Sequence, residues 1–313
     1  MRSFFDPTLI EHGGAAFIRE DKVNDALARL IPKVHITKGH FSCPTRAELR
    51  DLTWNHMDQN HRPLIHRTYG DTVRVHISQQ SAFTLTKFGN WPAIIPMFDG
   101  YHKENGFYQV TCLFGLIVII TVIECNSTEQ GTRMDVDWAI ASHRLLRFLH
   151  GPLDRRLKRL NEAQNREDEV IRDQRVALRA VGYRFLTDTP DFMNSNVLAH
   201  NVVFPPVGRL HSIPLAELAE GQTQRIEICD RAYVVRRTGE TVEVWPGICP
   251  HEGAPLQAEH VRSGTVKCPW HGLEFGVRKL SPDAPAITVC GARLQVTDAS
   301  LTIRPVQAGV INA

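Results

Sequence analysis

Two short segments in the C-terminal third of this 313-residue chain constrain its fold more than any other feature. They read CPHEGAPLQ at residues 249–257 and KCPWHG at residues 267–272. Each holds a cysteine and a histidine within a tight turn, where proline stiffens the loop and glycine permits unusual backbone angles. The four potential metal ligands are Cys249 and His251 in the first loop and, after sixteen intervening residues, Cys268 and His271 in the second.

Two such loops facing each other have two chemical uses. They can bind one tetrahedral zinc ion, or a [2Fe–2S] cluster with two thiolates on one iron and two imidazoles on the other. The pattern resembles the Rieske domain over roughly residues 209–305. In the cytochrome-complex branch of that family these loops contain two further cysteines, which this chain lacks, so the resemblance is to the ferredoxin or oxygenase branch. It implies a one-electron [2Fe–2S] cluster held by Cys249, His251, Cys268 and His271.

The chain after about residue 209 consists of short alternating segments separated by Gly, Pro and Asp, such as AYVVRRT at 232–238. This spacing is typical of a small all-β domain. Pro205 and Pro206 precede it and predict a linker. We therefore expect two domains, residues 1–205 and residues 206–313.

The first two-thirds of the chain are mixed in character. The segments that look like strands are 35–43, 72–88 and 107–125, and those that look helical are 134–151 and 153–182. The apolar, β-branched run at 113–123 is too short to cross a bilayer and reads as a buried strand. Strands followed by a long late helix predict an α+β domain, in which an antiparallel sheet folds around that helix.

The N-terminal segment WNHMDQNHRPLIHR concentrates three histidines in eleven positions. Taken alone, it is consistent with a polar helix and turn whose histidines are solvated. In a chain that also resembles a Rieske protein, Asp58, His61 and His66 match the D-x2-H-x4-H motif of Rieske oxygenases residue for residue. The resemblance implies that His61 and His66 bind a mononuclear non-heme iron, and that His56, which has no place in the motif, is structural.

Pro63 lies between the two expected ligands. On an unbroken helix, residues five positions apart would point about 140° apart, at about 100° per residue. Proline interrupts a helix. We expect a break at Pro63 that re-aims both histidines at one metal.

The third ligand of such an iron is a carboxylate. NREDEVIRDQR at 165–175 resembles the acidic stretch in a late helix of Rieske oxygenases. The resemblance implies Asp168 as the ligand, with Glu167 as the alternative. A charge run of this kind is otherwise a solvated helix face.

Asp58 is not itself a ligand in the motif. Metal-bound histidines donate their other ring N–H to a carboxylate or carbonyl, and the spacing suits Asp58 to accept it from His61. In the resembled family this aspartate also reaches a cluster histidine of the neighbouring subunit. That implies a role for Asp58 in electron transfer and a head-to-tail homo-oligomer, most simply a trimer.

Ordinary Rieske oxygenase α chains place the cluster domain first, and this chain reverses that order. The resemblance implies a helix-grip (START-like) catalytic domain with its pocket between the sheet and the long helix. It implies an oxygenase, either mono- or dioxygenase, that uses O₂. The electrons would come from NAD(P)H through a separate reductase, directly or by way of a ferredoxin, because no G-x-G-x-x-G fingerprint follows a strand. The apolar strands favour a small apolar or aromatic substrate. The alternative is a ligand-binding START-like domain fused to a Rieske ferredoxin, without its own iron site.

Composition and the first residues bear on nucleic-acid binding, membrane insertion and cellular location. A net charge of +2, without a Lys/Arg block interleaved with aromatics, predicts no nucleic-acid partner. A hydrophobic content of 42% suits a buried core and predicts no membrane-spanning protein. The first residues, MRSFFDPTLIEHGG, lack the pattern of a signal peptide, so we expect a cytoplasmic protein whose seven cysteines are thiols and metal ligands.

Overall fold

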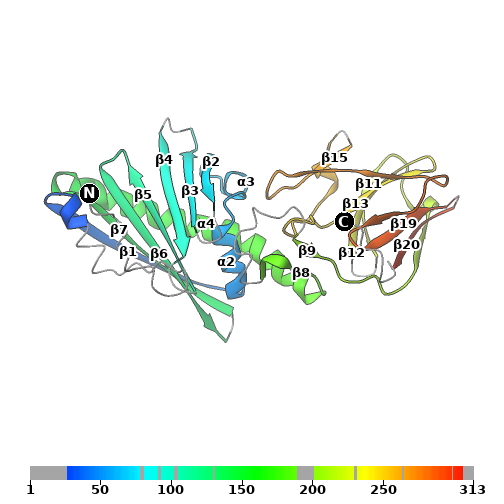
Figure 1. The fold of residues 1–313 in the computed structure, drawn as a ribbon, viewed down its shortest axis with the longest axis horizontal. Helices are drawn as coiled ribbons and strands as arrows, with labels where there is room; N and C mark the ends of the chain where they lie inside the picture. Colours follow the sequence, from blue (N-terminus) through cyan, green and yellow to red (C-terminus); the bar gives the residue numbers. More distant parts are fainter. Residues whose placement is uncertain are drawn as a thin grey trace. The chain divides into compact units, whose positions relative to one another are not determined.

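A computed structural model describes residues 27–77, 81–90, 93–101, 105–129, 131–188, 201–228, 231–262, 264–297 and 299–305 (Figure 1). Contacts divide the chain into two compact units. The first comprises Met1–Asp173 and Thr187–Asn196, and the second comprises Gln174–Leu186 and Val197–Ala313. Within the described ranges, no helix is long and apolar enough to cross a membrane.

The first unit is built on a seven-stranded antiparallel sheet in the order β1-β7-β6-β5-β4-β3-β2 (Figure 1). From β2 to β7 each strand pairs with its neighbour in sequence, and β1 completes the sheet by pairing with β7. The strands are β1 (Val34–Thr45), β2 (Tyr69–Ile77), β3 (Ser81–Phe88), β4 (Ile94–Tyr101), β5 (Gly106–Leu113), β6 (Ile117–Thr128) and β7 (Gly131–His143).

Helices pack against this sheet. They are α2 (Leu49–Met57), α3 (Arg62–Ile65), the 3-10 helix η2 (Arg144–Leu149) and α4 (His150–Ala180). Leu52 of α2 and Leu153 of α4 belong to one apolar core cluster with Trp138 and Ile140 of β7. The expected antiparallel sheet with a long late helix is therefore confirmed, and its arrangement is that of a helix-grip fold.

A glycine lets α4 come close to the sheet. The indole Nε1 of Trp138 donates a hydrogen bond to Oδ1 of Asp154 on α4 at 2.9 Å. Gly39 is the β1 partner of Trp138, and a Cβ at this position would overlap both side chains. The missing side chain leaves the space in which β7 and α4 bond.

The expectation of a helix at 134–151 is wrong, because this segment forms β7 and then η2. Buried Met134, Val136 and Trp138 alternate with residues that are more exposed, which is the period of a strand paired on both sides. The run at 113–123 is also not one strand. Phe114 (φ 53°) and Gly115 (φ 68°) form a turn that separates β5 from β6.

The second unit is all-β apart from the end of α4 and short 3-10 turns, as far as the structure describes it. Its two four-stranded sheets, β10-β20-β19-β18 and β11-β12-β13-β17, share one apolar core. A smaller sheet has the order β14-β15-β16, and β8 pairs with β9. The strands are β8 (Arg184–Phe185), β9 (Val202–Val203), β10 (His211–Pro214), β11 (Thr223–Ile228), β12 (Arg231–Thr238), β13 (Thr241–Pro246), β14 (Val261–Arg262), β15 (Thr265–Lys267), β16 (Glu274–Gly276), β17 (Arg278–Leu280), β18 (Ile287–Val289), β19 (Ala292–Val296) and β20 (Ser300–Pro305).

The two Cys/His segments are loops of this unit. The first follows β13, and the second connects β15 to β16. The expected all-β C-terminal domain is confirmed. The end of α4 belongs to the same unit, where Leu178, Tyr183 and Phe185 form a buried cluster with Val202 and Ile248.

Candidate metal centres

A short helix spaces the two N-terminal histidines. α2 ends just before Asp58, its C-cap, and α3 is flanked by His61 as N-cap and His66 as C-cap. Pro63 lies in the first turn of α3, where its missing N–H removes no helical hydrogen bond. The helix break expected at Pro63 therefore falls before it, and α3 separates the two histidines.

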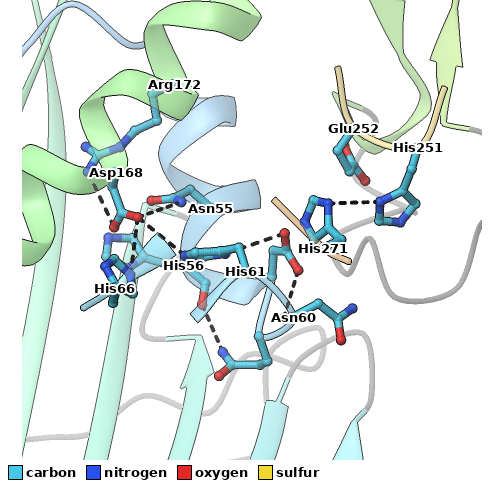
Figure 2. Close-up of polar contacts among 12 residues, drawn as sticks. Asn55, His56, Asn60, His61, His66, Asp168, Arg172, His251, Glu252 and His271 are labelled. Atoms are coloured by element: carbon cyan, nitrogen blue, oxygen red, sulfur yellow. Dashed lines mark hydrogen bonds and ion pairs between the residues drawn. The ribbon is translucent and has the colours of Figure 1, made fainter. Parts of the chain in front are cut away.

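His61, His66 and Asp168 converge on one point (Figure 2). The Nε2 atoms of His61 and His66 lie 3.4 Å and 3.3 Å from Oδ1 of Asp168, which comes from α4. One donor atom of each residue lies within 4.8 Å of the others, and all three residues are buried. Donors that share one ion through bonds of about 2.1 Å at right angles lie about 3 Å apart. The donor set and its spacing fit a divalent metal.

A carboxylate lies beside the outer nitrogen of each histidine. Oδ2 of Asp58 lies 3.5 Å from Nδ1 of His61, and Oε2 of Glu167 lies 3.1 Å from Nδ1 of His66. Carboxylates in this place fix the tautomer that leaves Nε2 free to bind a metal. Glu167, the alternative ligand, thus contacts the ring nitrogen that faces away from the convergence point, and sequence reasoning missed this role.

The buried charges of this group balance one another. Burial raises the pKa of Asp168, but its hydrogen bond with His61 and the positive charges nearby outweigh burial, so the pKa falls overall. Burial lowers the pKa of His61, but hydrogen bonds to Asp168 and Asp58 raise it overall. The pKa of His66 is lowered by burial, which favours the neutral, metal-binding imidazole. A divalent cation would supply the positive charge that a proton on His61 otherwise provides.

Two further residues complete the surroundings. Nδ2 of Asn55 donates to Oδ1 of Asp168 at 3.3 Å. The ring of His56 lies 4.8 Å from that of Phe107, and burial lowers the pKa of His56 to about 3. His56 does not belong to the converging group.

A cavity lies beside the converging side chains. One part of its wall is apolar and includes Phe107, Ile123, Met134 and Val136. Another part is polar and includes Arg62, Asp99, Gln109, Gln164 and Arg172. Arg62 and Asp99 form a double hydrogen bond of 3.2 Å and 2.9 Å, and Gln109 donates to Asp99 at 2.7 Å.

The C-terminal loops bring their four expected ligands together. Nδ1 of His251 lies 3.2 Å from Nδ1 of His271, with the two rings at 86° (Figure 2). Sγ of Cys268 lies 4.0 Å from Nδ1 of His271. A side-chain hydrogen bond joins Cys249 to Cys268. Two imidazole nitrogens at this distance are spaced as neighbouring ligands of one ion, about 3 Å apart. These residues fit a group with two imidazole and two sulfur ligands.

The loop backbone favours thiolates. The hydrogen bond from Cys249 and the nearby His271 lower the pKa of Cys268 to about 4. Burial raises the pKa of Cys249. The backbone N–H groups of His251 and Glu252 donate to its sulfur, which acts in the opposite direction and lowers that pKa. Such N–H donors stabilise negative charge on the sulfurs of an iron–sulfur cluster.

The family match decides between zinc and iron–sulfur. The Rieske [2Fe-2S] domain family matches residues 209–289, a span that includes both loops. This chain contains a Rieske domain. The expected [2Fe–2S] cluster follows, and with it a part in electron transfer. No curated protein matches the chain.

Solved structures show weak similarity to this chain. The di-domain ARO/CYC StfQ from the steffimycin biosynthetic pathway has a TM-score of 0.41 at 11% identity, over 50% of this chain and 58% of its own. The Zhui aromatase/cyclase from Streptomyces sp. R1128 has a TM-score of 0.37 at 10% identity, and the match covers 47% of this chain and 99% of the aromatase/cyclase chain. Truncated norcoclaurine synthase from Thalictrum flavum has a TM-score of 0.36 at 10% identity, and the match covers 44% of this chain and 95% of the synthase chain. The strand order and the long helix α4 by themselves give the first unit its helix-grip arrangement.

Glu167→Gln should weaken Fe(II) or Co(II) binding at the N-terminal site by about 10–100-fold, because an amide accepts the His66 N–H less strongly than a carboxylate does. Anaerobic metal titration followed by Co(II) absorption measures the change. Glu162→Gln on the same helix is the control. Equal affinities in the two variants would contradict the role of Glu167.

Proposed function

We propose that this chain is a Rieske-type non-heme iron oxygenase. The observation that carries the proposal is the convergence of His61, His66 and Asp168 in a chain that also contains a Rieske [2Fe-2S] domain. Two histidines and one carboxylate are the donor set of non-heme iron sites that activate O₂. Hydroxylation by such an enzyme takes up O₂, two electrons and two protons, places one oxygen atom in the substrate and releases the other as water.

Each residue of the site has a part in this proposal. His61, His66 and Asp168 would hold the iron, which when bound supplies the activation of O₂. Asp58 and Glu167 orient the two imidazoles through Nδ1. Within the described residues, the converging group offers three donors and no fourth, which leaves ligand positions for O₂.

The cavity wall suggests the substrate class. Its apolar part fits the apolar or aromatic body expected from the sequence. Among the described residues, buried Nε and Nη1 of Arg172 and Nε2 of Gln164 have no hydrogen-bond partner. Buried donors left unpaired cost about 1–3 kcal/mol each. We propose a substrate with an apolar body and an oxygen acceptor, such as a carboxylate or carbonyl.

Electron supply and assembly are also parts of the proposal. Electrons would come from NAD(P)H through a separate reductase, directly or by way of a ferredoxin, and enter at the cluster. Asp58 would contact a cluster histidine of a neighbouring copy and so link the cluster of one chain to the iron of the next. The copies would form a head-to-tail ring, most simply a trimer.

Iron content tests the proposal directly. The wild-type chain should hold three irons, two in the cluster and one at His61, His66 and Asp168. Asp168→Ala should hold two, with an unchanged Rieske EPR signal and no product, because the facial site needs its carboxylate. Asp173→Ala, an exposed aspartate of the same helix, is the control and should hold three.

The competing function is a ligand-binding helix-grip domain fused to a Rieske ferredoxin, which the cavity and the fold also suit. It predicts two irons in the wild type and no change on Asp168→Ala. That result would overturn the oxygenase proposal while leaving the Rieske domain in place.

Mixed oligomers test the route of the electron. A cluster-dead chain (Cys268→Ser) and an iron-dead chain (Asp168→Ala) should each be inactive. If the electron passes between chains, co-assembly should restore a substantial part of the turnover. An inactive mixture, with co-assembly confirmed by mass spectrometry of tagged chains, would show that each cluster serves its own chain.

Paired small molecules test the substrate class. Benzoate and benzamide should stabilise the iron-loaded protein against heat more than toluene does, and Arg172→Met should remove that difference. Gln164→Leu serves the same purpose if Arg172→Met loses iron. Equal stabilisation by all three compounds in the wild type would contradict the need for an oxygen acceptor.

A further inference from the structure

The cluster domain contains a buried ion pair that the proposed reaction does not use. Nη1 of Arg175 lies 2.6 Å from Oε2 of Glu252, and the side chains of both residues are 0% exposed. Nδ2 of Asn201 donates to Oε1 of the same carboxylate at 2.6 Å. All three residues belong to the second compact unit. We call them the Glu252 network.

This network lies at the first cluster loop. Glu252 directly follows the expected ligand His251 (Figure 2). The backbone N–H of Glu252 is one of the two that donate to the sulfur of Cys249. The carboxylate and the N–H···S donor thus belong to one residue, so whatever fixes the side chain also fixes the donor.

Further contacts hold the same loop. The carbonyl of Pro250 accepts from the backbone N–H groups of Asn201 and Val202, at 3.0 Å and 2.9 Å. Gly253 has a φ of 88°, and a Cβ there would lie 2.9 Å from both Leu178 and Phe185. The loop between Cys249 and Gly253 therefore lies against the end of α4 and the 201–202 segment.

Stability alone does not account for this pair. Burial of two charges costs several kcal/mol per ion, and a well-packed apolar pair of similar volume is often as stable or more so. Charge and hydrogen bonds near the sulfurs, by contrast, directly set the reduction potential of an iron–sulfur cluster. Reduction adds one negative charge, and a charge buried in a low dielectric acts on it strongly.

We propose that the Glu252 network sets the reduction potential of the Rieske cluster. Asn201 and Arg175 position the N–H donor of Glu252 at the Cys249 sulfur, and Arg175 cancels a negative charge that would oppose reduction. The inference concerns the cluster domain alone and holds whether or not the N-terminal unit binds iron.

Two single variants should shift the potential in opposite directions. Arg175→Met removes a positive charge and leaves the negative charge of Glu252 without its guanidinium, so the cluster should become harder to reduce and its potential should fall. Glu252→Gln keeps the side-chain shape and removes the negative charge, so the potential should rise. The amide of Asn201 can turn to bond the new glutamine, because its Oδ1 has no partner among the described residues.

The measurement is a redox titration of the full-length, cluster-loaded protein, followed by circular dichroism, with EPR of the reduced form. The control is Arg179→Met, whose guanidinium lies 5.2 Å from the centre of the same Phe185 ring that Arg175 covers at 3.8 Å. It should leave the potential and the EPR g-values unchanged. The double variant Arg175→Met/Glu252→Gln should return the potential toward the wild-type value.

Two results would overturn the proposal. Unchanged potentials in both single variants, with the cluster retained, would leave the network a purely structural role. A fall in both would show that the loop has merely loosened, without any charge effect. If Arg175→Met takes up no cluster, Glu252→Gln decides alone: a rise supports the proposal and no change refutes it.

Discussion

A carboxylate on the buried face of α4 is the constraint on which the N-terminal domain depends. An unpaired carboxylate inside a protein costs far more than a domain of this size can offset, so Asp168 must have positive partners. The fold supplies them from two directions. α3 presents His61 and His66 to Oδ1, and Arg172, one turn further along α4, lies 3.7 Å from Oδ2. The three groups that would hold a metal are thus also the groups that make this burial possible.

A similar problem recurs in the cluster domain and has a different solution. Glu252 is more deeply buried than Asp168, but its partners include a guanidinium and an amide, which cannot lose a proton or bind a metal at ordinary pH. Its charge is therefore permanently matched. The N-terminal group can exchange a proton for a cation, whereas the Glu252 network keeps a fixed electrostatic environment beside a redox centre.

The sequence predicted the parts of these sites that depend on local spacing. Cys249, His251, Cys268 and His271 lie on two tight turns, and His61 and His66 lie on either side of one short helix, so each pair is set by a few residues. Asp168, about 100 positions from the two histidines, was named only through the family resemblance. The carboxylate role of Glu167 and the pairing of Arg175 with Glu252 are not part of the resembled motifs and join residues about 75 to 100 positions apart, so nothing in the local sequence indicated them. On α4 these residues sit in a run of charges that sequence alone reads as solvated. Their burial depends on what packs against the helix.

The difference between local sequence and tertiary contacts also explains why a helix was wrongly expected at residues 134–151. Met134, Ala139 and Ala141 are good helix formers, and Leu145 to Leu149 continue an apolar pattern. β7 nevertheless pairs with β1 on one side and β6 on the other, and this tertiary pairing overrides local propensity. The two Asp residues at 135 and 137 were the contrary signal, since acidic residues two apart around Val136 suit a strand with one face buried.

Contacts of the α4 end also bear on the extent of the cluster domain. Sequence reasoning placed its start at Pro206, after the paired prolines. The second compact unit comprises Gln174–Leu186 and Val197–Ala313, so it also includes the end of α4. Leu178 and Phe185 pack against Gly253, and Arg175 neutralises Glu252. The division between the two units falls within α4, where the sequence shows no change of composition. The residues of α4 that pack on the sheet and those that pack on the cluster loop recur with the same helical period. Only the partner of each side chain distinguishes them. The first cluster loop of this chain therefore has an ion-pair partner, Arg175, on a helix that lies outside the 209–289 span of the family match.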